Sequence, residues 1–138
     1  MLKAGDTAPE FPGFPENRPV LLAFFKISCP TCQFTFPYLQ RMADKVPIVG
    51  ISQDDSESTD GFRQAFGLTF PILLDPPRYL VSNSYALSHV PSLFLVEPDR
   101  RISLAADGFS RRVLEEIGQR FGAVPFKGGE RVPEFKPG

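Results

Sequence analysis

The sequence predicts an α/β domain in which a mixed central β-sheet is flanked by helices in three layers, α/β/α. Short apolar runs of strand length alternate with segments whose apolar residues recur every three or four positions. Two such runs, residues 20–25 and 48–52, flank one helical segment, and a strand–helix–strand crossover of this kind makes its two strands parallel. Residues 92–96 and 101–106 flank the turn Glu-Pro-Asp-Arg and predict an antiparallel hairpin. Parallel and antiparallel pairs together make the sheet mixed.

The length of 138 residues suits a single domain that spans the whole chain. Residues 1–19 precede the first strand, and we expect them to form an extended N-terminal segment. Residues 123–138 are rich in glycine and proline, which predicts an extended surface tail rather than a regular element.

Charge and hydropathy limit the classes of partner. The 15 basic and 16 acidic residues nearly cancel, and no block of like charge predicts a nucleic-acid or membrane surface. No apolar run reaches the roughly 18 residues of a membrane span, and the start lacks the pattern of a secretory signal. We therefore expect a cytoplasmic protein. In a reducing compartment, two neighbouring cysteines are reactive or metal-binding more often than they form a structural disulfide.

The only two cysteines, Cys29 and Cys32, follow the apolar run of residues 20–25. That run is continuous, as expected for a central strand covered on both faces. Beyond the cysteines a helical segment presents one apolar stripe, made of Phe36, Leu39, Ala43 and Val46. The pair is therefore predicted at the carboxyl end of a strand, on the first turn of a helix.

Helix-terminating and helix-capping residues place three further helices. Residues 62–66 predict a short helix that ends at Gly67. Residues 70–75 follow as a short strand or an extended connection. Asp75 is expected to cap the next helix, which Pro76 or Pro77 begins and which ends near Leu87. Ser110 is expected to cap the last helix, and Gly122 to end it. The predicted order is strand, helix, strand, helix, short strand, helix, hairpin, helix.

Four motifs occur in an order typical of one superfamily, although each is weak by itself. They are CPTC followed by Pro37, GISQDD after the second strand, FGLTFPILLD, and YALSHVPSLFLVEPDRRI. With them, nearly the whole chain resembles the thioredoxin-like superfamily. Within it, the chain is most similar to the TlpA-type and alkyl-hydroperoxide-reductase/thiol-specific-antioxidant (AhpC/TSA) branch.

The resemblance implies a thioredoxin-like fold and the activity of a thiol-disulfide oxidoreductase. It also implies that the Val90–Pro91 peptide bond is cis and faces the cysteines, where Val90 backbone atoms can hydrogen-bond a substrate. Pro30 and Thr31, between the two cysteines, complete the predicted substrate-binding residues.

The expected chemistry follows from the placement of the cysteines. A thiolate is the nucleophile in disulfide exchange, and the first turn of a helix favours negative charge through its unpaired N–H groups and its dipole. Cys29 is therefore expected to attack a substrate disulfide, and Cys32, one turn further on, to resolve the mixed disulfide. Substrates would be disulfide-containing proteins or small thiols, and electrons would come from an upstream dithiol protein. We expect no bound cofactor; the sequence does not disclose the oligomeric state.

Several positions depart from the family pattern or lie close to the predicted site. The family's buried aspartate and its glutamate are replaced by Ala23 and Thr35, which leaves no evident base for the resolving cysteine. Ser28 replaces a tryptophan and makes the rim smaller and more polar. Lys26 and His89 are possible modulators of the thiolate, although a solvated side chain is the simpler expectation for each.

Two neighbouring features have simpler interpretations. Asp54, Asp55 and Glu57 are expected to form a solvated loop that caps the following helix. Phe34 lies off the apolar stripe of its helix and is expected to be exposed near the site.

Two other functions remain open on the sequence. A peroxiredoxin would use Cys29 as its peroxidatic thiol, but it needs a hydroxyl residue three positions earlier and a proline seven earlier, where this chain has Lys26 and Leu22. A Cys/Cys/His site made of Cys29, Cys32 and His89 would bind copper or zinc, but a structural zinc site requires four ligands. We therefore expect no metal ion.

Overall fold

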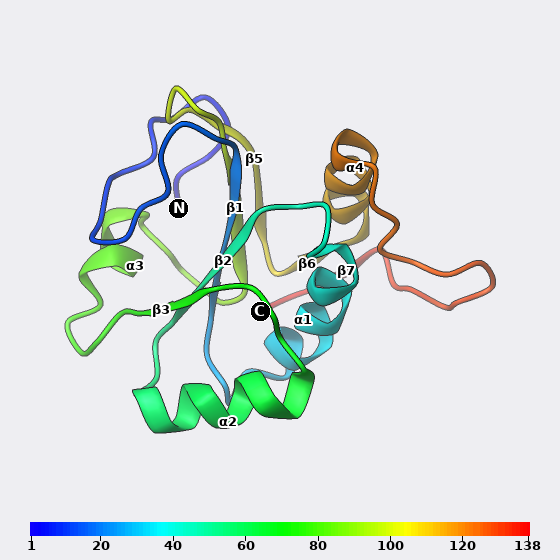
Figure 1. The fold of residues 1–138 in the computed structure, drawn as a ribbon, viewed down its shortest axis with the longest axis horizontal. Helices are drawn as coiled ribbons and strands as arrows, with labels where there is room; N and C mark the ends of the chain where they lie inside the picture. The colour runs from blue at the N-terminus through cyan, green and yellow to red at the C-terminus, as the bar shows by residue number, and fades with distance from the viewer.

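The computed structural model describes all 138 residues, and a five-stranded sheet forms its centre (Figure 1). The strand order is β3-β2-β1-β4-β5. The parallel strands are β1 (Val20–Phe25), β2 (Ile48–Ser52) and β3 (Ile72–Leu74), whereas β4 (Ser92–Val96) and β5 (Ile102–Asp107) run antiparallel to β1 and to each other. The predicted mixed sheet is confirmed.

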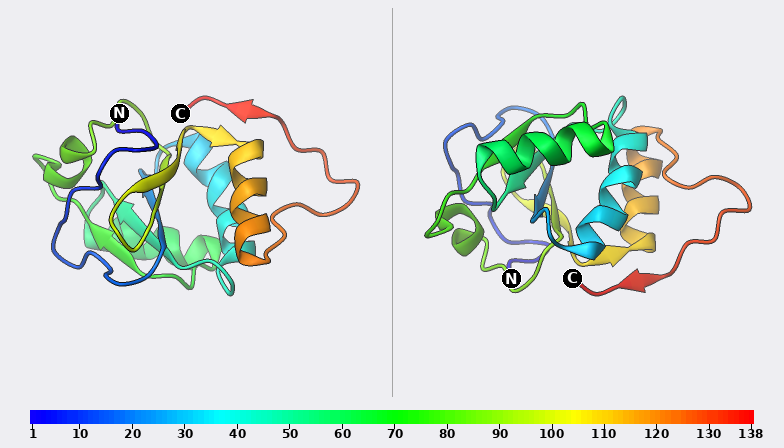
Figure 2. Two further views of the ribbon diagram at one scale, coloured as in Figure 1. Left: turned by 90° about the horizontal axis from the view of Figure 1, so that it is seen from above. Right: turned by 90° about the horizontal axis from the view of Figure 1, so that it is seen from below.

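Helices and the N-terminal segment cover the two faces of this sheet (Figure 2). The core beneath one face includes residues of α1 (Pro30–Met42), α2 (Ser56–Phe66) and α4 (Arg111–Phe121). The core beneath the other face lies under α3 (Leu80–Ser84) and the N-terminal segment. This is the predicted three-layer α/β/α arrangement.

Strand β1 divides the two cores because its side chains alternate between the faces of the sheet. All six of its residues are buried. Leu21, Ala23 and Phe25 join the core under α1, and Val20, Leu22 and Phe24 join the core that contains Tyr85. The site-bearing loop therefore follows a strand that is held on both sides.

The ends of the helices agree with their capping residues, but one helix begins earlier than predicted. Ser110 caps α4, while Gly67 and Gly122 end α2 and α4 in the left-handed conformation. Helix α2 begins at Ser56, because the Asp55 carboxylate accepts a hydrogen bond from the Ser58 N–H at 2.8 Å. Its first turns are mostly solvent-exposed, so they lack the apolar spacing on which the prediction relied.

Helix α3 is shorter than predicted. It runs only from Leu80 to Ser84 and begins after Tyr79, whose φ is +48°. The buried Asp75 carboxylate nevertheless accepts hydrogen bonds from the Val81 and Ser82 N–H groups, at 3.2 and 2.8 Å. Asp75 thus provides hydrogen-bond acceptors for N–H groups in the first turn of the helix, although it lies six residues before Val81.

The tail, residues 123–138, contains a regular element that the sequence did not predict. Its strand β7 (Phe135–Lys136) pairs antiparallel with β6 (Phe109–Ser110), the short continuation of β5. Figure 2 shows the tail leaving α4, swinging outward and returning to this strand. Two paired residues are too few to show strand periodicity, so the sequence did not indicate this strand. The rest of the tail contains no helix or strand, as expected.

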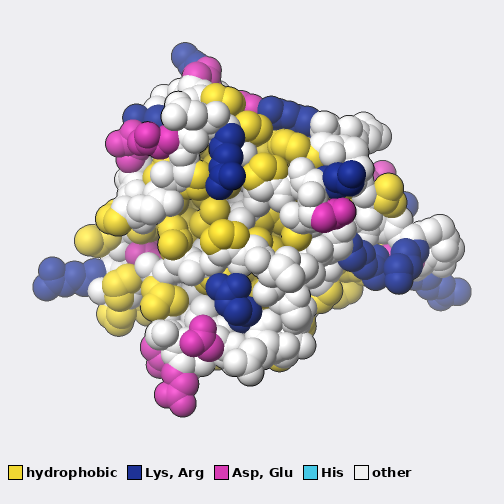
Figure 3. Space-filling view, in the orientation of Figure 1, with side chains coloured by type: hydrophobic (Ala, Val, Ile, Leu, Met, Phe, Trp, Pro, Cys, Tyr) yellow, Lys and Arg dark blue, Asp and Glu magenta, His cyan; other side chains and the backbone are white.

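The surface carries both charge signs without a single-sign patch on the face drawn in Figure 3, where basic and acidic side chains surround an apolar centre. None of the helices has the length and hydropathy that a membrane crossing requires.

Two helical glycines predict opposite effects of the same substitution. A Cβ at Gly61 of α2 would contact nothing within 4 Å, whereas one at Gly118 of α4 would lie 2.5 Å from the Ala123 carbonyl oxygen. Gly61→Ala is expected to raise the free energy of unfolding by about 0.5–1 kcal/mol through helix propensity. Gly118→Ala is expected to lower it by about 1–3 kcal/mol, because the start of the tail must move. Urea unfolding of both variants measures the two signs, and a stabilised Gly118→Ala variant would contradict this packing.

Candidate active site

Cys29 lies at the junction of β1 and α1, where it is the N-cap residue of the helix. Its Sγ accepts a hydrogen bond from the Cys32 N–H at 3.2 Å. Pro30 occupies the first helical position, where a missing N–H costs nothing. The unpaired N–H groups and the dipole of α1 favour negative charge at this end of the helix. The local structure therefore suits Cys29 to act as a nucleophile.

Cys32 has a different environment although it lies only one helical turn away. Its side chain is fully buried, and burial raises the pKa of its thiol well above the ordinary value. A side-chain interaction with the Cys29 sulfur raises the pKa of the Cys32 thiol further. Cys32 is therefore protonated at neutral pH, and both cysteines are free thiols in this structure.

The loop before β4 brings a backbone acceptor to the same sulfur. The Cys29 thiol donates to the Val90 carbonyl oxygen at 3.4 Å, and the Val90–Pro91 peptide bond is cis. Pro91 is buried, whereas Val90 is half-buried. The structure thus places two of the predicted substrate-binding residues directly beside the predicted nucleophile.

The predicted modulators lie around the rim. Lys26 and Ser28 are exposed. Lys26 and His89 line a cavity of about 230 Å³ that also reaches Val90. Neither cysteine lines this cavity, which meets the site only through Val90.

The metal-site alternative is not supported by the position of the histidine. His89 is exposed, and its Nδ1 lies 3.4 Å from the Asp107 carboxylate rather than on the cysteines. Across the chain, no three His, Cys, Asp or Glu side chains are grouped as a metal ion would require. The alternative Cys/Cys/His set is therefore not assembled.

Thr31 and Phe34 are more enclosed than the sequence suggested, because the tail covers them. Thr31 is only 8% exposed, and its hydroxyl donates to the Pro137 carbonyl oxygen at 2.6 Å. Phe34 is half-buried between the rings of Tyr38 and Phe109. The expectation of an exposed Phe34 was wrong. No sequence pattern indicated that the tail would return to this helix.

Asp54 is a site residue that the sequence interpretation assigned to a solvated loop. It is half-buried, and its carboxylate accepts a hydrogen bond from the Ile27 N–H at 2.7 Å, which holds the loop that leads to Cys29. Its negative charge also contributes to the raised pKa of Cys32. The carboxyl ends of parallel β1 and β2 meet at one edge of the sheet, so the position of Asp54 just after β2 was a usable indication.

The two positions that depart from the family pattern provide no base. Ala23 is buried in β1. Thr35 is buried in α1, and its hydroxyl donates to the Thr31 carbonyl oxygen at 2.7 Å. The acid–base chemistry of Cys32 must therefore depend on solvent or on groups outside these positions.

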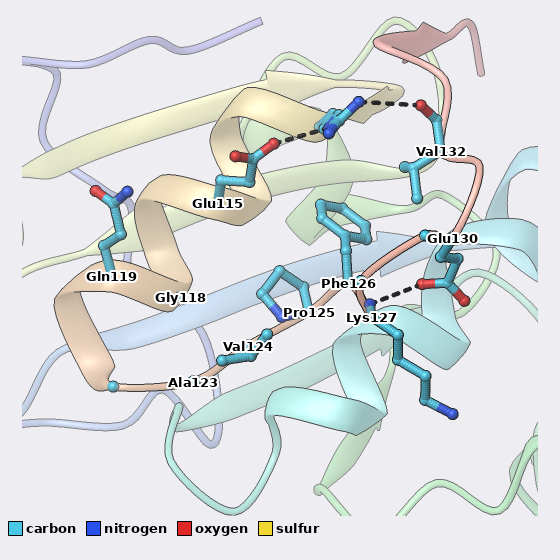
Figure 4. Close-up of a pocket in the computed structure, with 14 residues that line it drawn as sticks. Glu115, Gly118, Gln119, Ala123, Val124, Pro125, Phe126, Lys127, Glu130 and Val132 are labelled. Atoms are coloured by element: carbon cyan, nitrogen blue, oxygen red, sulfur yellow. Dashed lines mark hydrogen bonds and ion pairs between the residues drawn. The ribbon is translucent and has the colours of Figure 1, made fainter.

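The largest cavity does not contain the cysteines. It has a volume of about 640 Å³ and lies between α4 and the first part of the tail, as Figure 4 shows. Glu115 and Lys127 are among its lining residues, and Arg111 Nη1 hydrogen-bonds the Val132 carbonyl oxygen across it at 3.4 Å. The cavity separates the tail from the helix but brings no reactive group together.

The family model described as AhpC/TSA matches residues 5–105, which include both cysteines and the Val90–Pro91 bond. The chain belongs to the AhpC/TSA family. This confirms the resemblance that the four motifs indicated.

Curated relatives of this AhpC/TSA protein carry names from disulfide chemistry. The thiol-disulfide oxidoreductase ResA of Halalkalibacterium halodurans is 24% identical over 109 residues, covering 74% of this chain and 61% of its own. The thiol:disulfide interchange protein DsbE homologue of Paracoccus denitrificans is 26% identical over 110 residues, covering 75% of this chain and 62% of its own. The chain thus spans just over three-fifths of the length of these relatives.

Solved structures confirm the thioredoxin-like fold. The thioredoxin domain of a thiol-disulfide oxidoreductase from Bacteroides vulgatus has a TM-score of 0.72 and 21% identity, covering 88% of this chain and 99% of that domain. A secreted disulfide oxidoreductase of Mycobacterium tuberculosis has a TM-score of 0.66 and 22% identity, covering 78% of this chain and 82% of that one.

The unequal environments of the two thiols predict selective alkylation. With reduced protein and excess iodoacetamide at pH 7, Cys29 is expected to be modified and Cys32 to remain unmodified, because burial and the raised pKa keep Cys32 a thiol. Peptide mass spectrometry after alkylation locates the label. In a matched reaction under denaturing conditions both cysteines are expected to react. Equal labelling of both in the folded protein would contradict the assigned environments.

Proposed function

We propose that this protein is a thiol-disulfide oxidoreductase in which Cys29 is the nucleophile and Cys32 the resolving thiol. One observation carries the proposal: Cys29 Sγ lies 3.4 Å from the Val90 carbonyl oxygen and accepts the Cys32 N–H at 3.2 Å. A reactive sulfur, its resolving partner and a backbone contact for substrate therefore meet at one point. The names of the relatives support the same chemistry.

The reaction that this geometry supports has two exchange steps. The Cys29 thiolate attacks one sulfur of a substrate disulfide, the substrate S–S bond breaks, and the leaving sulfur takes a proton. Cys32 then loses its proton and attacks Cys29 Sγ, which releases the second substrate sulfur as a thiol. The substrate gains two electrons, and the Cys29–Cys32 pair becomes a disulfide. An upstream dithiol protein would reduce that pair by the same steps in reverse.

Burial of Cys32 affects the second step most. Its thiol must lose a proton before it can attack, and its raised pKa makes the thiolate scarce at neutral pH. Neither Ala23 nor Thr35 supplies a base. We therefore propose that resolution by Cys32 is slower than the first attack by Cys29.

Pro30, Thr31, Val90 and Pro91 are the proposed substrate contacts, and Lys26, Ser28 and His89 the proposed modulators at the rim. The substrates are disulfide-containing proteins or small thiols, and the chemistry uses no bound cofactor. The cytoplasmic location stays a prediction from the sequence, and the similar M. tuberculosis protein is described as secreted.

A peroxidase role is the less favoured alternative. A peroxidatic pocket requires a hydroxyl where this chain has the exposed Lys26, and a proline where it has Leu22, buried in β1. Both differences leave Cys29 without the groups that would bind and polarise a peroxide.

A redox titration tests the proposed pair. In thiol–disulfide buffers, the Cys29–Cys32 disulfide is expected to form and disappear reversibly in a two-electron transition, measured by thiol alkylation and mass. A midpoint near about −270 mV would indicate a reductase, and one near about −120 mV an oxidant. If no internal disulfide formed at any poise while peroxide converted Cys29 to sulfenic acid, the peroxidase alternative would replace this proposal.

Single cysteine variants test the two roles separately. Cys32→Ser is expected to form a mixed disulfide with a peptide disulfide that persists, because the resolving thiol is missing. Cys29→Ser is expected to form little or none, since its remaining thiol is buried and protonated at pH 7. Intact mass under non-reducing conditions distinguishes them, and rapid adduct formation by Cys29→Ser would reverse the assignment.

A further inference from the structure

The end of the tail lies against the candidate active site, and backbone groups hold it there. We call residues 134–138 the tail strand. Phe135 and Lys136 pair antiparallel with Ser110 and Phe109, and the Arg111 N–H donates to the Glu134 carbonyl oxygen at 3.0 Å. β6 and β7 thus form a two-stranded sheet of their own, separate from the central sheet, and this pairing holds the tail strand in place.

Gly108 allows the tail strand to approach so closely. Its φ is +88°, and a Cβ added there would lie 2.5 Å from the Lys136 carbonyl oxygen. The Gly108 N–H donates to the Pro91 carbonyl oxygen at 2.8 Å, so the same residue contacts both the tail strand and the loop beside Cys29. This position favours glycine for both its backbone conformation and the space it leaves.

The side chain of Lys136 lies on the aromatic ring of Phe34. Its Nζ is 5.1 Å from the ring centroid, within the range of a cation–π interaction. Phe34 belongs to α1, the helix that begins at the cysteines. The Phe34 ring thus contacts the basic side chain of the tail strand.

The last two residues of the tail strand lie against Thr31 and against Val90, whose carbonyl oxygen is a partner of the reactive sulfur. The Pro137 carbonyl oxygen accepts the Thr31 hydroxyl at 2.6 Å. A Cβ built on Gly138 would lie 2.2 Å from the Val90 carbonyl oxygen, the atom that Cys29 Sγ also contacts. The tail strand therefore occupies the place that a substrate chain attached to Cys29 would enter.

The contacts that hold the tail strand are of a kind that another extended chain can also make. Phe135 is 55% exposed, and Pro137 and Gly138 are also exposed, so little apolar surface is buried. Backbone pairing with a sheet edge does not depend on the side chains of the added strand. An incoming extended peptide can therefore exchange with the tail strand.

The rest of the tail leaves the strand room to move away. Arg41 anchors the tail through two hydrogen bonds to the Glu130 carboxylate, at 2.7 and 2.9 Å. Beyond this anchor, Arg131, Pro133 and Glu134 are exposed, so few buried contacts hold the segment that leads to the tail strand. Residues 131–138 can therefore move away from α1 and Val90 while the Arg41–Glu130 contact stays in place.

We propose that the tail strand is a displaceable internal cover of Cys29. It occupies the surface formed by Thr31, Phe34, Val90 and Gly108, which we call the groove, and it gives up this surface to an extended polypeptide strand with a basic side chain. In the absence of that ligand, the tail strand fills the groove and shields Cys29. Identifying this ligand as a substrate rests on the proposed oxidoreductase function. The contacts between the groove and the tail strand do not depend on that function.

The first experiment measures access to Cys29 in the reduced 138-residue chain. The double variant Lys136→Gln/Gly138→Ala removes the cation from Phe34 and introduces a Cβ against the Val90 carbonyl oxygen. The second-order rate of alkylation by iodoacetamide is expected to rise about three- to tenfold, a range consistent with loss of one exposed cation–π contact and one close backbone fit. Losing a positive charge would by itself disfavour a thiolate, so a faster reaction reports access.

The matched control is Lys127→Gln/Gly128→Ala, which makes the same chemical changes at the other end of the tail. Lys127 and Gly128 are exposed, and a Cβ at Gly128 would contact nothing within 4 Å. Its alkylation rate is expected to equal that of the unmodified protein. Equal alkylation rates for the unmodified protein and both variants would contradict the proposal that the tail strand shields Cys29. A faster rate explained by a shift of its pH profile, rather than by the same increase at every pH, would also contradict it.

The second experiment supplies the strand as a separate peptide. The hexapeptide PEFKPG, the sequence of residues 133–138, is expected to slow alkylation of the Lys136→Gln/Gly138→Ala variant towards the rate of the unmodified protein. PEFEPG is expected to protect about two- to fivefold more weakly, because glutamate cannot replace the cation on Phe34. No protection by either peptide at millimolar concentration, or equal protection by both, would overturn the proposed ligand.

These measurements use reduced protein and follow only the reaction of Cys29 with a reagent. A chain that never forms the Cys29–Cys32 disulfide, but shows the expected rates and peptide protection, would reject the proposed function and keep the groove. A chain that cycles reversibly in the redox titration but shows no effect of the tail would do the reverse.

Discussion

The pairing of β1 with β4 is the constraint on which the candidate site depends. Phe24 lies opposite Ser92 in this antiparallel pair, so the loop that leaves β1 and the loop that enters β4 meet at one edge of the sheet. Cys29 and Val90 are 61 residues apart in sequence, yet the sulfur and the carbonyl oxygen are separated by 3.4 Å. A slip of one residue in this register would turn the alternating apolar side chains of β1 to the wrong cores, so the burial of both faces also holds the site.

One turn of helix then gives two identical thiols different chemical roles. Cys29 is the N-cap residue and remains partly accessible, and its sulfur accepts the Cys32 N–H. Cys32 points from the next turn into the core under α1, where burial raises the pKa of its thiol. Asp54, which holds the loop through the Ile27 N–H, adds a negative charge that acts in the same direction. The asymmetry between the two thiols therefore comes from position along α1 rather than from residue type.

The tail pairs with β6 and also contacts Thr31, which lies between the two cysteines. Neither the strand order nor the packing of the helices requires these contacts. The route of the tail is determined by a few polar anchors, among them the ion pair between Arg41 and Glu130 and the Thr31 hydroxyl. Between these anchors it buries little apolar surface, and most of its side chains are exposed. Elements held by few buried contacts open at a low free-energy cost. A segment of this kind can cover a reactive thiol and still give way to a competing chain.

Much of the fold was determined locally and could be predicted from the sequence. The apolar run of β1, the N-cap position of Cys29, the glycines that end α2 and α4, and the hairpin of β4 and β5 each depend on residues close together in the chain. The contacts of His89, Thr31 and the tail strand could not be predicted in this way. Their positions depend on which loops the sheet brings to one edge, and on a two-residue strand that pairs only because β6 is already there. Short-range patterns determine the elements, whereas contacts between distant segments exist only after the chain has packed, and those contacts decide how exposed each thiol is and what covers it.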